Sequence, residues 1–193
     1  LVARDVDASL YLMFQLASTS TVGYSASHAL VCGTLCHIMA REFSLPEHER
    51  NALVRAALTM NIGMTLLQDE LAVQREPLNS TQQKAVAEHP RVGQALLEER
   101  DITDDLWLDL VSQHHGNVPL STPLAQLKAE DRLTRLLGTI DRYAAMISPR
   151  KSRVGRSATD SVRALVGQEI DQRDEVSLML VRTVGLCPPG TFV

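Results

Sequence analysis

Aromatic residues and cysteines are scarce in this sequence, and long apolar runs are absent. Phe, Trp and Tyr make up 4% of the chain, so a core has to be built mostly from aliphatic side chains and Met. The three cysteines, Cys32, Cys36 and Cys187, are too few and odd in number for a disulfide framework. No apolar run reaches the roughly 18–20 residues that cross a membrane. The sequence therefore predicts a cytoplasmic protein without a membrane span.

The charge of the chain is mildly acidic. It carries 23 Asp and Glu against 19 Lys and Arg, a net charge of −4. General nucleic-acid binders are usually basic, so this balance argues against DNA as a partner. Apolar residues make up 45% and charged residues 22%, which excludes a disordered or collagen-like chain. A chain of 193 residues is long enough for one domain with its own core.

Helical periodicity extends over most of the sequence. One stripe has apolar residues at Val31, Leu35 and Ile38, spaced by four and three residues. Asn79 and the hydroxyl residues after it are helix-cap candidates, and Pro90 is expected to break the helix that they begin. The predicted fold is all-α, a compact bundle of about seven to nine helices. Further helices are expected over residues 24–42, 47–59, 91–99, 104–114, 126–147, 159–170 and 173–184.

The chain divides into three parts. Residues 1–22 form an amphipathic lead-in that either packs on the domain or mediates a homodimer. Residues 23–185 form the domain itself. Residues 186–193 contain two prolines and a glycine followed by Thr-Phe-Val, which predicts a turn into a short β-strand. The partner of that strand is expected in a segment outside this sequence.

Two polar residues fall on apolar helix faces. His28 lies three residues before Val31, so its side chain is expected to point inward. Asp141 comes four residues after Leu137 and three before Ala144, which also predicts an inward position. A buried carboxylate without a partner is costly, so Asp141 needs a cation, a metal ion or strong donors. For His28 alone, a core histidine bonded to a backbone carbonyl is the simpler interpretation.

Three more histidines lie at expected helix boundaries. His89 precedes a proline, and His114 and His115 are adjacent near a helix end, where both side chains can converge on one cation. Neutral imidazole and carboxylate are the usual ligands of Zn, Fe and Mn. With His28 and Asp141, these residues suggest a metal centre.

The order and spacing of several segments resemble a known family. The segments are YSASH at 24–28, AALTMNIGM at 56–64, LNSTQQKAVAEHPRVG at 78–93, VSQHH at 111–115 and LGTIDRYAAMISPRKSR at 137–153. Together they resemble the HD-GYP domain, a bacterial branch of the HD phosphohydrolase superfamily. The terminal CPPGTFV is similar to the tail that often follows such domains. The resemblance implies an HD-type helical bundle.

The resemblance also implies a metal-dependent activity on a bacterial second messenger. Enzymes of this family hydrolyse cyclic di-GMP with two or three metal ions, usually iron or manganese, which activate a bridging hydroxide. Arg150 and Arg153 match basic positions that contact the nucleotide phosphates. The residues that match the family's metal ligands are His28, His89, His114, His115 and Asp141.

The sequence departs from the family at its defining His-Asp pair, which falls on Met60 and Asn61. In the family this aspartate bridges two metal ions, whereas Asn61 offers one neutral oxygen and Met60 a soft thioether. The glutamate that the family has four residues before its first histidine is Tyr24 here, and the lysine that follows the His-Asp pair is Met64. The GYP loop is reduced to GNVP at 116–119. We therefore expect a degenerate centre, with no confident catalytic residue, that holds at most one ion well.

Three functions fit this pattern. The favoured one is a degenerate HD-GYP-like signalling domain that lacks efficient hydrolysis and acts as a regulatory, binding or interaction module. The second is a metal-dependent phosphohydrolase with an altered centre of one Fe, Mn or Zn ion, which is suggested by His89, His114, His115 and Asp141. The third is a structural scaffold like the related HDOD domains. The expected partners are cyclic di-GMP or another nucleotide and regulatory domains such as a diguanylate cyclase.

Overall fold

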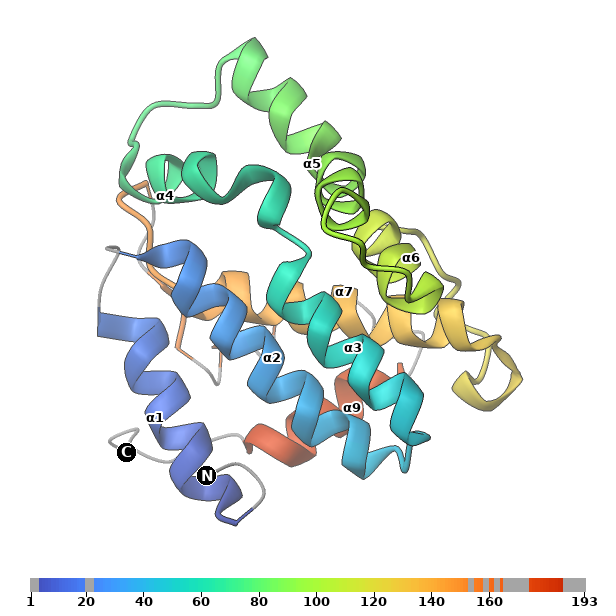
Figure 1. The fold of residues 1–193 in the computed structure, drawn as a ribbon. Coiled ribbons are helices and arrows are strands. Elements are labelled where there is room, and N and C mark those ends of the chain that lie inside the picture. Colours follow the sequence, from blue (N-terminus) through green and yellow to red (C-terminus); the bar gives the residue numbers. More distant parts are fainter. Residues whose placement is uncertain are drawn as a thin grey trace.

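The computed structural model of the chain is helical throughout the part that it describes (Figure 1). The described residues are 4–19, 23–152, 155–157, 160–161, 164 and 174–185. Within these ranges there are α-helices and two short 3-10 helices but no strand, which confirms the all-α prediction. The strand expected in 186–193 and most of the helix expected over 159–170 lie outside the described residues.

The helices follow one another with short connections. None that the structure describes is both long enough and apolar enough to cross a lipid bilayer. Their bounds are α1 (Val6–Thr19), α2 (Tyr24–Glu42), α3 (Glu47–Thr59), η1 (Ile62–Met64), α4 (Thr65–Val73), α5 (Ser80–Glu98), α6 (Asp105–Gln113), η2 (Leu124–Gln126), α7 (Ala129–Ile147) and α9 (Glu175–Val184).

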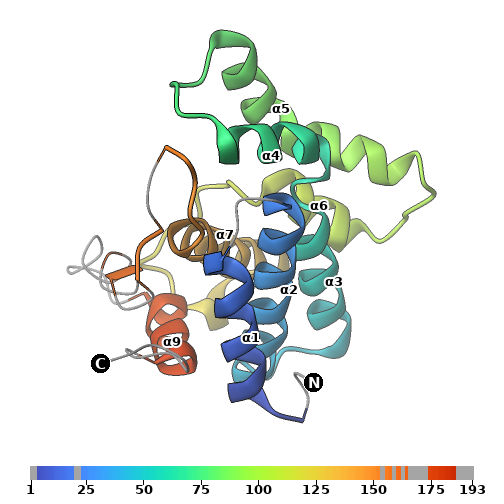
Figure 2. The ribbon, with the colours of Figure 1, turned by 90° about the vertical axis from the view of Figure 1, so that its left-hand side faces the viewer.

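Helix α2 lies at the centre of the bundle, between α1 and α3 and against α7 (Figures 1 and 2). Its apolar face, with Leu35 and Met39, packs into one core with Leu53 of α3 and Leu137 of α7. All four side chains are fully buried. Since α2 and α3 run in opposite directions, the start of α2 and the end of α3 lie at the same end of the bundle.

Helix α5 differs from the prediction, because it continues through Pro90 instead of breaking there. A proline inside a helix lacks the N–H that would bond the carbonyl four residues earlier, which here belongs to Val86. That carbonyl accepts a hydrogen bond from Nδ1 of His89 instead, at 2.6 Å. A side chain therefore replaces the missing backbone donor, and the helix runs on to Glu98.

Residues 62–73 form η1 and α4, which the apolar periodicity does not single out. The pattern is obscured because apolar side chains in this segment face solvent, and Leu66 is 80% exposed. Gly63 lets η1 lie directly on α5, since a Cβ at this position would collide with the carbonyl oxygen of His89. The segment that follows α3 is thereby held beside the helix that carries His89.

Candidate metal centre

Three histidines from two helices form what we call the three-histidine cluster: His89 of α5, and His114 and His115 at the end of α6. Their ligand nitrogens all lie within 4.8 Å of one another. His89 and His114 are buried, whereas His115 is exposed. The ring centroids of His114 and His115 are 4.1 Å apart, and those of His89 and His115 are 5.3 Å apart. The structure thus brings together the three histidines that the sequence places at helix boundaries.

Hydrogen bonds determine which ring nitrogens of the cluster carry hydrogen. Nδ1 of His89 lies 2.6 Å from the carbonyl oxygen of Val86, and Nδ1 of His114 lies 2.8 Å from that of Val111. A carbonyl oxygen only accepts, so both Nδ1 atoms are donors, and in neutral rings both Nε2 atoms present lone pairs. These two Nε2 atoms face each other at 3.1 Å. The arrangement therefore requires a proton or a metal ion between them.

Burial of the two rings disfavours a proton between their Nε2 atoms. Burial and the nearby positive charge of His115 lower the pKa of His114 to about 4. Burial also lowers the pKa of His89. Both rings are thus neutral at pH 7, which is the form in which imidazole binds metals. Two nitrogens bound to one tetrahedral ion stand about 3.3 Å apart, close to the observed separation. The cluster therefore fits a divalent metal ion.

Local helix geometry orients each of the two buried rings. Pro90 frees the Val86 carbonyl for His89, and the end of α6 leaves the Val111 carbonyl available for His114. A carbonyl that accepts the second ring hydrogen is the usual support of a metal-bound histidine, because it selects the tautomer and fixes the ring. The sequence signal for this support is the proline after His89.

His28, Cys32 and Asp141 form a second group, with ligand atoms within 4.8 Å of one another. His28 Nε2 donates to Asp141 Oδ1 at 2.8 Å, which gives the aspartate the donor that its inward position requires. Burial alone would raise the pKa of Asp141, but the hydrogen bond from His28 and the electrostatic interactions with His28, His114 and His115 lower it overall. Asp141 of the second group is therefore close enough to His114 and His115 of the three-histidine cluster to interact with them electrostatically.

Cys32 is a member of this group that the sequence does not assign to the site. Its Sγ lies 3.5 Å from Nε2 of His28, one helical turn earlier on α2. Burial, with the charge of Asp141, raises the pKa of the Cys32 thiol well above its usual value, so it is neutral. Its spacing of four residues from His28 is the signal that could have found it. Cys36 is fully buried in the core.

Arg150, which the resemblance matches to a position that contacts nucleotide phosphates, lies against a tyrosine in this structure. Its Nε and Nη2 atoms lie 3.2 and 3.0 Å from the Tyr24 hydroxyl oxygen, and its guanidinium lies 4.9 Å from the ring centroid. The Tyr24 ring in turn stacks on His28, with centroids 5.8 Å apart. A phosphate at this position would take the place of the tyrosine hydroxyl as acceptor. Arg153 lies outside the described residues.

Met60 and Asn61 follow α3 and precede η1. The Met60 side chain is 1% exposed and belongs to the hydrophobic core. Asn61 is half-buried, and its carbonyl accepts a hydrogen bond from the Met64 amide at 2.9 Å. Neither side chain carries an imidazole or a carboxylate.

A comparison with protein families finds one match over most of the chain. Residues 11–174 match the profile of the HD domain family. The matched range includes both histidine-containing groups, Met60, Asn61 and Arg150. No curated protein sequence matches the chain.

Proposed function

The chain belongs to the HD domain family, within a superfamily of metal-dependent phosphohydrolases. From this premise we propose that it is an HD-GYP-like regulatory domain that binds one divalent metal ion and lacks efficient hydrolysis. The observation that carries the proposal is the pair of facing Nε2 atoms of His89 and His114 at 3.1 Å. With both Nδ1 atoms donating to carbonyls and both rings neutral, a metal ion is the partner that this pair lacks.

The side chains around the cluster support binding rather than turnover. A two-metal mechanism needs a carboxylate that bridges the ions, and Asn61 is neutral while Met60 is buried among apolar residues. Asp141 is engaged by His28. An ion held by the three-histidine cluster would supply positive charge to a phosphate oxygen. We propose cyclic di-GMP or another nucleotide as the ligand and a regulatory domain such as a diguanylate cyclase as the partner.

A second candidate function rests on the exposure of His115. A three-histidine site with one open position is the arrangement of catalytic zinc centres. The exposed side of the cluster gives a substrate access to such a position. In this alternative the chain is a single-metal phosphohydrolase that acts on cyclic di-GMP or another phosphodiester. A measurement of phosphodiester turnover distinguishes this phosphohydrolase from the regulatory domain.

Metal content tests the proposed site. Elemental analysis of the purified chain, prepared with Mn, Fe or Zn and no chelator, is expected to give about one ion per chain, as three ligands and an open position imply. His114→Ala and His115→Ala should lower this content, whereas His48→Ala, an exposed histidine outside the cluster, should leave it unchanged. A metal-free wild-type chain, or equal content in all variants, would contradict the site.

Hydrolysis of cyclic di-GMP tests the regulatory assignment. The metal-loaded chain is expected to turn over far more slowly than ordinary enzymes, which work at about 1–1000 per second. A rate in that range, abolished by His114→Ala, would favour the phosphohydrolase instead. The double variant Met60→His with Asn61→Asp is expected to raise the metal content above that of the wild type. Unchanged content would contradict the role given to these two positions.

A further inference from the structure

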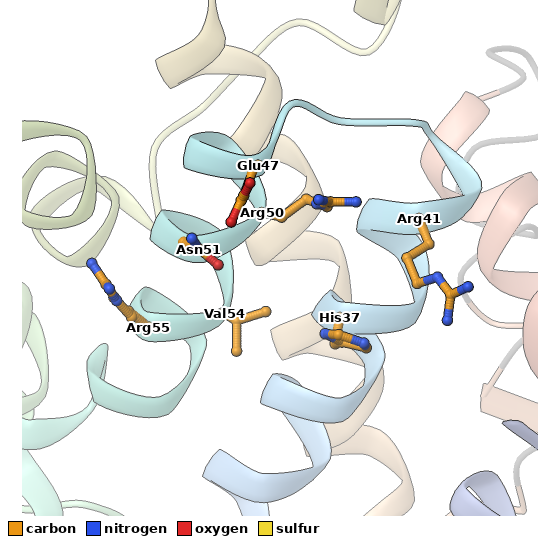
Figure 3. A pocket seen from close by; sticks show the side chains of 7 residues that line it. All are labelled: His37, Arg41, Glu47, Arg50, Asn51, Val54 and Arg55. Carbon is orange, nitrogen blue, oxygen red and sulfur yellow. The ribbon is translucent and has the colours of Figure 1, made fainter. Parts of the chain in front are cut away.

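A pocket of about 540 Å³ opens between the C-terminal half of α2 and the N-terminal half of α3 (Figure 3). This volume lies in the range of small-molecule sites. His37, which lines it, is nine residues beyond His28 on α2, or about 14 Å along the helix axis. The pocket therefore lies at the opposite end of the α2–α3 pair from the candidate metal centre.

Positive charge dominates the lining. Arg41, Arg50 and Arg55 are among its lining residues, against the single carboxylate of Glu47, in a chain whose net charge is −4. In Figure 3 the Arg50 side chain extends from α3 towards α2. Among the residues that the structure describes, neither Arg41 nor Arg50 forms an ion pair, even with the Glu47 of the same pocket. Two guanidinium groups are thus available to an anion.

The third arginine is held at the edge of the pocket. Arg55 lies over the Trp107 ring, 5.5 Å from its centroid, and its Nη1 is 3.4 Å from an Asp104 carboxylate oxygen. Between the two helices, Val54 contributes an apolar surface and Asn51 an amide that can both donate and accept. The lining therefore offers an apolar contact and hydrogen-bonding groups beside its free cations.

We propose that this pocket binds a small phosphate-bearing molecule. The planar guanidinium groups of Arg41 and Arg50 match the oxygen geometry of a phosphoryl group and bind it through charge-assisted hydrogen bonds. Glu47 and Asn51 suit hydroxyl or amide groups on the rest of the molecule, and they favour a phosphorylated metabolite over a bare anion. The site is separate from the metal centre and does not depend on it.

Inorganic pyrophosphate is the probe for the phosphate-binding part of this site. Amide NMR spectra of the metal-free chain, in chelator, are expected to show saturable shifts confined to the pocket helices. Because charge-assisted hydrogen bonds to both arginines are lost, Arg41→Gln with Arg50→Gln should weaken binding at least tenfold. Glu47→Gln should tighten it, because a like charge is removed. Arg75→Gln, an exposed arginine between α4 and α5, should have no effect.

The Arg75→Gln variant separates a site from general charge attraction, because nonspecific attraction would weaken on the loss of any exposed arginine, whereas a site responds only to Arg41 and Arg50. Binding that weakens equally in the Arg75 variant, or that never saturates, would overturn the proposal. So would shifts centred on α5 and α6 rather than on α2 and α3. The His114→Ala variant should bind pyrophosphate as the wild type does, so failure of the metal site and failure of this pocket give different results.

Discussion

The Tyr143 hydroxyl is buried without a hydrogen-bond partner among the described residues. A buried unsatisfied hydroxyl costs roughly 1–3 kcal/mol. Tyr143→Phe removes this group and keeps the ring, whose edge-to-face contact with Phe14 spans 6.5 Å between centroids. The substitution is therefore expected to raise the free energy of unfolding at pH 7 by about 1 kcal/mol, measured by urea denaturation. A destabilised variant would contradict this account.

The same residue predicts a dependence on alkaline pH. Burial raises the pKa of Tyr143 in the folded chain. A group whose pKa is higher in the folded than in the unfolded state stabilises the fold below its unfolded pKa, which is about 10 for tyrosine. That contribution is lost as the pH rises further. Above pH 10 the free energy of unfolding of the wild type should therefore fall more steeply with pH than that of the Phe variant. An equal dependence on pH in both proteins would contradict a raised pKa for Tyr143.

Single residues show where sequence reasoning reaches its limit at the candidate site. The inward positions of His28 and Asp141 follow from helical spacing, and the structure pairs them directly. The stacking of Arg150 on Tyr24 is not predictable in this way, since it joins residues 126 positions apart through the tertiary fold. Spacing along one helix is visible in the sequence, whereas contacts between distant loops and helices are not.

At the scale of one helix, Pro90 links the shape of α5 to the orientation of His89. Pro90→Ala would supply the N–H that bonds the Val86 carbonyl, which His89 Nδ1 now occupies. We expect this variant to be more stable by roughly 1–3 kcal/mol, because a proline in a helix interior is costly. It should bind metal about tenfold or more weakly, because the ring loses its support. Urea denaturation and metal titration measure the two effects.

Pro77→Ala is the matched control for this trade-off. Pro77 is exposed between α4 and α5, outside any helix interior. Its replacement should leave metal affinity unchanged. If Pro90→Ala gained stability and kept its metal affinity, the proline would have no part in orienting His89.

The helical elements differ in how far the sequence predicts them. The bounds of α2 and α3 agree with the predicted 24–42 and 47–59, because one continuous apolar stripe of each faces the core. For α5, a local rule about proline predicts a break, and a histidine side chain compensates for it. In η1 and α4 the exposed apolar residues obscure the periodicity. Periodicity thus predicts helices best where a single face is buried.

At the scale of the whole molecule, Arg135 joins α7, α9 and the loop between α6 and α7. Its Nε lies 2.8 Å from Asp174, the capping residue of α9, and its other nitrogens donate to loop carbonyls, including that of Thr122 at 2.7 Å. Both ion-pair partners are almost fully buried. Arg135→Leu leaves the Asp174 charge without a counter-ion, so the free energy of unfolding should fall by about 3–5 kcal/mol.

Arg142→Leu serves as the control, because Arg142 is an exposed residue of the same helix. Its effect should stay within about 0.5 kcal/mol. Chemical denaturation followed by circular dichroism compares the variants. An equal fall in the free energy of unfolding for the Arg135 and Arg142 variants would show that the buried ion pair does not stabilise the fold more than an exposed arginine does.

The two buried imidazoles of the centre are oriented by main-chain carbonyls, not by acidic side chains. Every residue type carries such a carbonyl, so replacement of the side chains at Val86 and Val111 leaves the acceptors in place. Neither Met60 nor Asn61 takes part in these two hydrogen bonds, so a change of either side chain also leaves the acceptors in place. Alignment of the two rings is therefore a property of the main chain, and side-chain substitution can alter their surroundings while the alignment persists.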